Sequence, residues 1–192
     1  MKVRTHFAEK EIDYDGSQIR SLWAYREFGL KDDCVAAFIG KCDVKPEFMV
    51  DMEDLKSGAK IFSPKMLHFI IEHFDNNLEA AVMRQRIFAT IVKESIEADH
   101  PDIGKKAYRM QDNLFAGDAK MTVSIATVTP VSTKVHFGIN IVAAPIQSVG
   151  VRTTGLDEMG IDARKLAGTV MQAYAAEMRS AREARCKVRG VR

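Results

Sequence analysis

The spacing of apolar and polar residues divides the chain into alternating strands and helices. Apolar and polar side chains alternate over residues 3–7, which predicts a short first strand. The turn residues Asp15-Gly16-Ser17 precede a helical stripe that is expected to stop at Gly29. The continuous apolar run 34–39 is typical of a buried central strand, and residues 48–50 predict another short strand.

The same patterns predict three longer helices. A serine hydroxyl followed by proline, as in Ser63-Pro64, favours a helix start, and the apolar positions that follow share one helical face, so a helix is expected over 63–74. A second stripe predicts a helix over 78–98, which His100-Pro101 would end. Asp162 suits the N-cap of the last helix, whose apolar face consists of Leu166, Val170, Tyr174 and Met178.

The stretch 120–141, KMTVSIATVTPVSTKVHFGINI, predicts an antiparallel hairpin. Its two apolar runs, 120–128 and 134–142, are separated by only a few residues, which is the usual connection between antiparallel neighbours. A lysine opens the first run. Burying an ammonium costs several kcal/mol unless an anion meets it, so Lys120 indicates a site for an anionic or acyl ligand.

The remaining segments complete a mixed order of strands and helices. Residues 108–115 predict an edge or partly exposed strand. The segment 143–160 is long for a connection, which favours a binding loop, with residues 150–155 as a lid. The whole order predicts a single α+β domain over 1–192, in which a mainly antiparallel sheet packs against helices.

Composition narrows the class of protein. The net charge of +2 gives no argument for nucleic-acid binding, and the basic C-terminus is best explained as a solvated helix end. Three widely spaced cysteines indicate neither a zinc ribbon nor a disulfide framework. The N-terminus lacks the apolar segment of a signal peptide and no run approaches 18 apolar residues, so we expect a cytoplasmic protein without a membrane span.

Five segments resemble an uncharacterised microbial family, the domain of unknown function 366. They read YDGSQIRSLWAYR, AFIGKCDV, MVDMED, MLHFIIEHF and MTVSIATVTPVSTKVHFGIN. The resemblance implies a fold similar to the lipoate and biotin ligases and the octanoyl transferases, which is also the class II synthetase catalytic fold. It implies no particular activity, because the activity of that family is not established.

A second resemblance is to the transferases and ligases themselves. Residues 120–124 are similar to a strand of the form K-I-(A/S)-(A/G)-(I/S), whose lysine touches the acyl carbonyl or the adenylate, and residues 137–141 look like F-A-L-N-V. Three motifs differ. Val135-His136 replaces a histidine-glycine pair, Ile146-Gln147-Ser148 replaces the transferase P-C-G-I motif, and Gly40-Lys41-Cys42-Asp43 stands nearest to the ligase R-R-x-S-G-G motif.

Several residue groups are candidates for the site. The resemblance suggests a pocket lined by Lys120, Ser124, His136, Gly138 and Asn140, beside Gly40. Lys120 could stabilise an oxyanion, His136 could assist, and Cys42 could be a nucleophile, although a buried inert thiol is the commoner situation. A second group of residues lies at the start of the first helix and is expected to bind anions, with ordinary helix capping as the alternative. These residues are Ser17, Gln18, Arg20 and Arg26.

Acidic and histidine groups offer further chemistry. Asp51, Glu53 and Asp54 could hold a divalent cation or a substrate amine, with Asp43 nearby, and a solvated turn is the alternative. His68 and Glu72 would share a face of the helix expected over 63–74 and form a hydrogen-bonded pair. His68 and His73 are too far apart around such a helix to chelate one metal, so no metal site is expected there.

Three functions remain open. The first is binding of a small carboxylate, its acyl-adenylate or an acyl thioester, with acyl transfer or ligation as the reaction; ATP with magnesium would be the cofactor for adenylation and a carrier protein the acceptor. The second is a non-catalytic binding or assembly protein. The third is metal-dependent hydrolysis by Asp43, Asp51, Glu53 and Glu72. Exposed sheet edges also predict a homo-oligomer.

Overall fold

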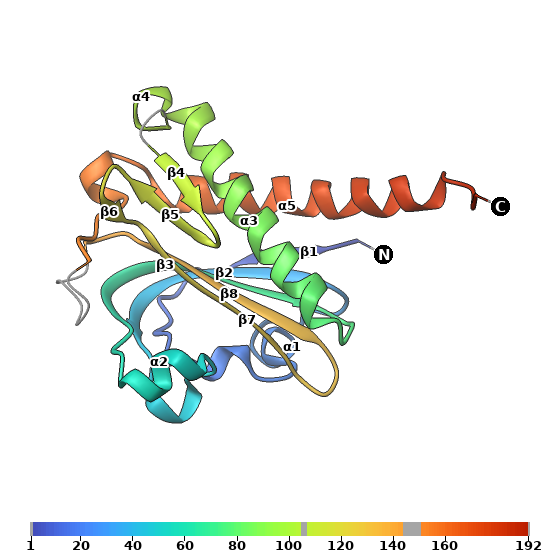
Figure 1. The fold of residues 1–192 in the computed structure, drawn as a ribbon, viewed down its shortest axis with the longest axis horizontal. Helices are drawn as coiled ribbons and strands as arrows, with labels where there is room; N and C mark the ends of the chain where they lie inside the picture. The colour runs from blue at the N-terminus through green and yellow to red at the C-terminus, as the bar shows by residue number, and fades with distance from the viewer. Residues whose placement is uncertain (1, 105–106, 144–150, 192) are drawn as a thin grey trace.

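A computed structural model describes residues 2–104, 107–143 and 151–191. Within these residues the larger sheet has five strands in the order β1-β2-β3-β8-β7 (Figure 1). β1 runs parallel to β2, and every other neighbouring pair is antiparallel. The strands are β1 (Arg4–Phe7), β2 (Cys34–Asp43), β3 (Phe62–His73), β7 (Thr122–Val128) and β8 (Thr133–Asn140).

A smaller sheet continues into the edge strand β7. Its strands are β4 (Ala107–Met110), β5 (Asn113–Ala116) and β6 (Ala119–Lys120). The Leu114 amide donates to Thr122 Oγ1 over 2.8 Å, and the Met121 amide donates to the Leu114 carbonyl over 2.9 Å. These bonds join the two sheets just after Lys120, the last residue of β6.

Helices cover the larger sheet on both faces (Figure 1). α3 (Leu78–Asp99) and α5 (Ala163–Cys186) lie on one side, and the shorter α1 (Trp23–Phe28) and α2 (Met52–Ser57) lie on the other. A single turn, α4 (Pro101–Gly104), follows α3, and three 3₁₀ turns are η1 (Ser17–Ile19), η2 (Pro46–Phe48) and η3 (Asp157–Met159).

The alternation of side chains along the central strands creates two hydrophobic cores. Phe69 and Phe137 face α3, where they pack with Phe88. Their strand neighbours point to the opposite face, where Ile70 packs with Phe38 under the N-terminal segment. Because both faces of β2 are buried, it is a continuous apolar run over 34–39, whereas β3 also buries the polar side chains of His68, Glu72 and His73.

The predicted fold class is confirmed, and so are the elements with strong local signals. The first strand, the central run at 34–39, the helix expected over 78–98 and the hairpin of β7 and β8 are all present. Asp162 caps α5 by accepting the Lys165 amide over 2.9 Å. The predicted stop at Gly29 is also present, with φ of 65° at this glycine.

The helix predicted over 63–74 is wrong, because this segment is the central strand β3. The spacing of its apolar residues is compatible with a helix or with a buried strand. The segment forms a strand because it pairs with β2 on one side and β8 on the other. Pro64 lies beside the irregularity in strand pairing between Gly40 and Cys42. A proline is tolerated there because its backbone nitrogen does not have to donate a hydrogen bond to the neighbouring strand.

Four smaller expectations also need correction. Residues 48–50 are not a strand but the end of η2 and the approach to α2. The expected strand at 108–115 is a hairpin of β4 and β5 that turns at Gln111, where φ is 58°. The first helix is split into η1 and α1, because Leu22 adopts a left-handed conformation between them. Lys120 belongs to β6 rather than to the start of β7.

α5 extends well past the sheet at its C-terminal end (Figure 1). Its side chains up to Tyr174 are buried on the core-facing side, whereas every described residue from Arg179 onward is exposed. None of the helices in the described part of the chain is long and apolar enough to cross a membrane. The single-domain organisation and the homo-oligomer stay predictions.

Gly40 should be sensitive to the smallest side chain. A Cβ at this position would lie 2.0 Å from the Ile12 carbonyl oxygen, so the backbone itself would have to move. We expect Gly40→Ala to lower the free energy of unfolding by about 2 kcal/mol, measured by urea denaturation. Gly168→Ala is the matched control, because this glycine lies inside α5 with nothing within 4 Å, and it should stabilise by up to about 1 kcal/mol.

Candidate functional site

A cavity of about 280 Å³ lies on the sheet face opposite α3 and α5. Its floor is formed by Val123 and Ile125 of β7 together with His136 of β8. The segment between η2 and α2 closes one side. Further lining comes from the N-terminal segment, from the turn of the small sheet and from the residues that flank η2 and α2, and includes Tyr14, Ile19, Val44, Ile61, Gln111, Asp112 and Asn113.

Lys120 lines this cavity from the junction of the two sheets. Its backbone is held on both sides, because its amide donates to the Arg152 carbonyl over 2.8 Å and its carbonyl accepts the Thr154 amide over 3.1 Å. The side chain is half-buried, and burial lowers the pKa of its ammonium. Among the described residues, no carboxylate lies within 4.0 Å of the Lys120 ammonium.

Three carboxylates line the same cavity, and two of them have other partners. Asp51 caps α2 by accepting the Glu53 amide over 2.8 Å and the Asp54 amide over 3.2 Å. Asp112 accepts from Gln85 over 3.3 Å and lies 3.8 Å from Arg86. Burial, followed by the charge on Asp51, raises the pKa of Asp54, and the charge on Lys120 opposes this rise.

His136 forms the polar part of the floor. Its Nε2 lies 3.0 Å from Nδ1 of His68 on β3, and Nε2 of His68 lies 3.3 Å from the Gly40 carbonyl oxygen. The Tyr14 ring stacks on His136 with centroids 3.7 Å apart. Burial lowers the pKa of His68 to about 3, and burial together with the neighbouring His68 holds the pKa of His136 well below its ordinary value.

Acid should destabilise the protein through these two histidines. An unfolded histidine has a pKa of about 6.5, so between there and pH 3 the unfolded state binds more protons and stability falls as the pH falls. The contribution of His68 alone should lower the free energy of unfolding by about 2 kcal/mol between pH 6.5 and 5. Urea denaturation across this pH range measures the effect. His136→Gln should make the dependence shallower. A free energy of unfolding that stays constant from pH 7 to 5 would contradict a neutral, buried pair.

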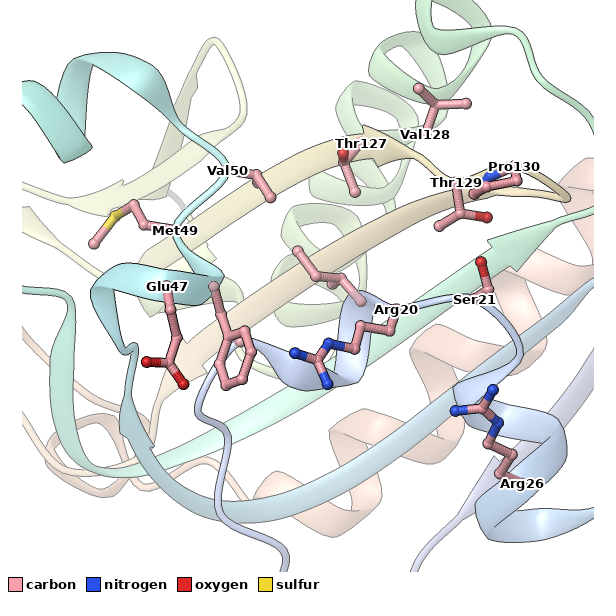
Figure 2. Close-up of a pocket in the computed structure, with 13 residues that line it drawn as sticks. Arg20, Ser21, Arg26, Glu47, Met49, Val50, Thr127, Val128, Thr129 and Pro130 are labelled. Carbon is pink, nitrogen blue, oxygen red and sulfur yellow. The ribbon is translucent and has the colours of Figure 1, made fainter.

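A larger groove of about 480 Å³ adjoins the cavity (Figure 2). The two share Ile19 and the residues 48–50. Arg20 and Arg26 lie on one side of the groove with Ser21, and Thr127, Val128, Thr129 and Pro130 line the other side (Figure 2). The Arg20 guanidinium lies 4.4 Å from the centre of the Phe48 ring. With two arginines against one acidic residue, Glu47, among its lining residues, the groove is a net cationic extension of the cavity.

Glu72 and Lys134 form a buried ion pair away from the cavity. The Lys134 ammonium lies 2.8 Å from Glu72 Oε2, and both side chains are at most 1% exposed. The other carboxylate oxygen accepts the Ser132 hydroxyl over 2.7 Å and the Leu22 amide over 3.3 Å. The predicted bond between His68 and Glu72 is not made. Both point to one sheet face, because they are four apart on a strand.

The structure groups some of the expected site residues and separates others. Lys120, Ser124, His136, Asp51 and Asp54 all line the cavity. The Ser124 hydroxyl accepts from Gln85 on α3. Asn140 lies behind Lys120, where its side chain donates to the Thr154 carbonyl over 3.3 Å. The absence of a side chain at Gly138 leaves room for Met66 beside His136. A Cβ atom on residue 138 would lie 2.3 Å from Met66 Sδ.

Other candidates have structural partners. Cys42 is fully buried in the second core, and burial raises the pKa of its thiol to about 12. Ser17 and Gln18 bond within their own loop, to Asp15 and Asp13 respectively. Asp43 pairs with Lys41 over 2.8 Å, and Glu53 is exposed on α2 rather than on a strand. No three histidine, cysteine or acidic side chains within the described ranges are placed to hold a metal ion.

The predicted lid falls partly outside the described residues. Residues 144–150, including Ile146-Gln147-Ser148, are not among them. Residues 151–155 run beside Lys120, where Thr153 forms a bridge with it. This part of the segment holds the Lys120 backbone in place.

Several residues of the cavity and of the buried ion pair were not expected from sequence. Tyr14 lies within the YDGSQ segment of the family resemblance, which is a signal for its role in the cavity wall. Lys134 also carried a signal, because a lysine between apolar strand positions requires a partner. Asp112 had none, since its position over the cavity depends on the turn between β4 and β5.

Comparison with known proteins gives the family. The model of the family described as a domain of unknown function, DUF366, matches residues 3–189. The chain belongs to this family. An uncharacterised protein of Methanocaldococcus jannaschii is 34% identical over 178 residues, which is 90% of this chain and 78% of the relative. A protein of unknown function from Pyrococcus horikoshi is 37% identical, with a TM-score of 0.90 over 99% of this chain and all of that one.

More distant structures share the fold alone. Biotin protein ligase from Aquifex aeolicus has a TM-score of 0.60 at 14% identity, over 95% of this chain and 72% of the ligase. A proposed lipoate protein ligase from T. acidophilum, solved with bound lipoic acid, has a TM-score of 0.57 at 12% identity, over 93% of this chain and 87% of that one. The family therefore has the biotin and lipoate ligase fold, as the sequence resemblance predicted.

Proposed function

We propose that this protein binds a small carboxylate, or its activated acyl form, in the cavity of about 280 Å³, with Lys120 contacting the carboxylate or acyl oxygen. The observation that carries the proposal is the half-buried ammonium of Lys120, which no described carboxylate approaches within 4.0 Å although its burial is costly. The charges of Asp112 and Asp54 act on this ammonium only from beyond 4.0 Å, so an anionic ligand would provide a direct partner at the point where the backbone fixes this side chain.

The apolar floor supports an acid with a hydrocarbon body. Val123, Ile125 and Ile19 line the cavity beside Lys120, so a chain or ring attached to the carboxylate would bury apolar area there. The T. acidophilum protein of the same fold was solved with lipoic acid, which is a molecule of this kind. Lipoate, octanoate and biotin are therefore suitable first probes.

The cationic groove supports an activated form of the acid. Arg20 and Arg26 with the hydroxyls of Ser21, Thr127 and Thr129 suit the phosphate of a nucleotide or of a carrier's prosthetic arm. If ATP is the cofactor, these residues would hold its phosphates, and ATP would supply the adenylyl group that activates the carboxylate, with pyrophosphate as the leaving group. The carrier protein as acceptor, and the acyl transfer or ligation that would follow, belong to the same proposal.

The alternative of a non-catalytic binding protein has one observation in its favour. The described lining of the cavity contains no cysteine, and its one serine, Ser124, already accepts from Gln85. Cys42, the nucleophile considered first, lies buried with a raised thiol pKa. These residues disfavour a covalent acyl-enzyme. They remain compatible with activation by a nucleotide and with binding alone.

A thermal-shift panel separates these functions. Lipoate, octanoate and biotin would each be added with and without ATP and magnesium. Ligand at about 100 times its dissociation constant should stabilise by roughly 2.7 kcal/mol, which raises the Tm of a domain of this size by about 5–10 °C. A shift that needs acid and ATP together supports activation, and a shift with acid alone supports binding. No shift with any acid would contradict the proposal.

A further inference from the structure

The two buried histidines form a chain of hydrogen bonds that begins at a backbone carbonyl. A carbonyl oxygen only accepts, so the Gly40 carbonyl requires a proton on Nε2 of His68, 3.3 Å away. His68 is fully buried without a carboxylate bonded to it, which keeps the imidazole neutral. A neutral imidazole carries one N–H, so Nδ1 of His68 is an acceptor.

The acceptor on His68 determines the state of His136. Nδ1 of His68 lies 3.0 Å from Nε2 of His136, so His136 must donate from Nε2. His136 is also neutral, because a second charge in this buried pair would face the cost of desolvation without a counter-ion. Its Nδ1 therefore carries no proton and is a hydrogen-bond acceptor.

This acceptor faces the cavity. His136 is 3% exposed, it lines the cavity, and no described residue donates to its Nδ1. Within the described part of the chain, every fully buried side-chain nitrogen or oxygen has a hydrogen-bond partner. Because Nδ1 of His136 has none, this atom must be exposed to the cavity. The stacked Tyr14 ring and the bond to His68 prevent the imidazole from turning away.

We propose that the cavity selects acids that carry an uncharged N–H or O–H donor, such as a hydroxyl, amide or ureido group, at the end remote from the carboxylate. The inference rests on the proposed function, in which Lys120 holds the carboxylate. His136 pairs with Ile125 in the middle of β7, whereas Lys120 precedes that strand as the last residue of β6, so the two polar points are separated along the sheet. The apolar residues Val123 and Ile125 around His136 disfavour a charged donor.

The tautomers can be read directly by NMR on the wild-type protein. Nitrogen-15 labelling of the five histidines, with His136→Gln and His68→Gln to assign the signals, reports which ring nitrogen carries the proton. We expect both His68 and His136 to be neutral at pH 7, each with its proton on Nε2. A proton on Nδ1 of His136, or a charged His136, would overturn the proposal without any ligand being present.

A matched pair of acids tests the selectivity. 8-Hydroxyoctanoate differs from octanoate by one hydroxyl, and titration calorimetry on the intact chain should show it binding about five-fold more tightly, as expected for one hydrogen bond. His136→Leu should abolish this preference, whereas His136→Gln, which keeps an acceptor, should retain part of it. Equal affinities in the wild type would overturn the ligand class.

The two proposals fail in different ways. If both acids bind equally and depend on Lys120, the carboxylate site stands and the donor selectivity does not. If neither of these acids binds, and lipoate and biotin do not bind either, the proposed function and the ligand class both fail, while the tautomers still decide whether the histidine chain exists. If His136→Leu does not fold, the wild-type affinities and the tautomer measurement decide the question.

Discussion

Lys120→Met should weaken binding of octanoate or lipoate by about 10- to 100-fold, because a charge-assisted hydrogen bond contributes roughly 1.5–3 kcal/mol. The fold should survive the change. Burial opposes the charge of Lys120, as the lowered pKa of its ammonium shows, and no described carboxylate within 4.0 Å loses a partner. Methionine keeps the length and apolar character of the lysine stem. The Tm of the variant should therefore equal or exceed that of the wild type.

The control for this variant is Lys56→Met. Lys56 is exposed on α2, the helix that also carries Asp54, but it does not line the cavity. Its loss changes the net charge by the same amount and should leave affinity within about two-fold, because exposed charges act weakly through water. Unchanged affinity in Lys120→Met, or an equal loss in both variants, would contradict a specific role for Lys120.

Lys134→Met should be the most damaging single change to stability, with an expected loss of about 3–5 kcal/mol. The substitution leaves the Glu72 carboxylate buried, 1% exposed, and among the described residues only the Ser132 hydroxyl and the Leu22 amide remain as its donors. Glu72 links β3, the turn before β8 and the start of α1, so the damage would reach all three. Urea denaturation at pH 7 measures the effect.

A double variant and a surface pair complete this test. Glu72→Gln together with Lys134→Met removes the unpaired charge, so it should regain part of the stability lost in Lys134→Met. Lys93→Met breaks the more exposed i, i+4 pair with Glu97 on α3 and should cost less than about 0.5 kcal/mol. If Lys134→Met costs no more than Lys93→Met, the buried pair is not a major contributor to the fold.

The comparison of prediction and structure shows where local patterns suffice. α3 matches the helix expected over 78–98, and α5 begins after the expected cap Asp162, because each helix has its own cap and its own apolar stripe. The hairpin of β7 and β8 was predicted because its two runs are joined by a short turn. The fold class followed from the resemblance and from the order of these elements. In each case the deciding interactions lie within a few residues of one another.

Residues 63–74 show the limit of that approach. A serine-proline start and an apolar stripe are genuine helix signals, yet the segment pairs with β2 over most of its length and with β8 from Met66 onward. Burial on both faces of the sheet outweighs local propensity, and neither partner is close in sequence. The assignment of His68 and Glu72 to a helix failed for the same reason.

The sequence by itself determined the first and central strands, the helix over 78–98, the cap at Asp162, the β7–β8 hairpin, the family and the anomaly of Lys120, because these depend on local spacing and on residue type. Only the tertiary structure decided which side chains meet. His68 contacts His136 across 68 positions, Glu72 contacts Lys134 across 62, and the cavity that contains Lys120 is bounded by segments from both halves of the chain. Such contacts arise from strand register and desolvation, which act between residues far apart in sequence.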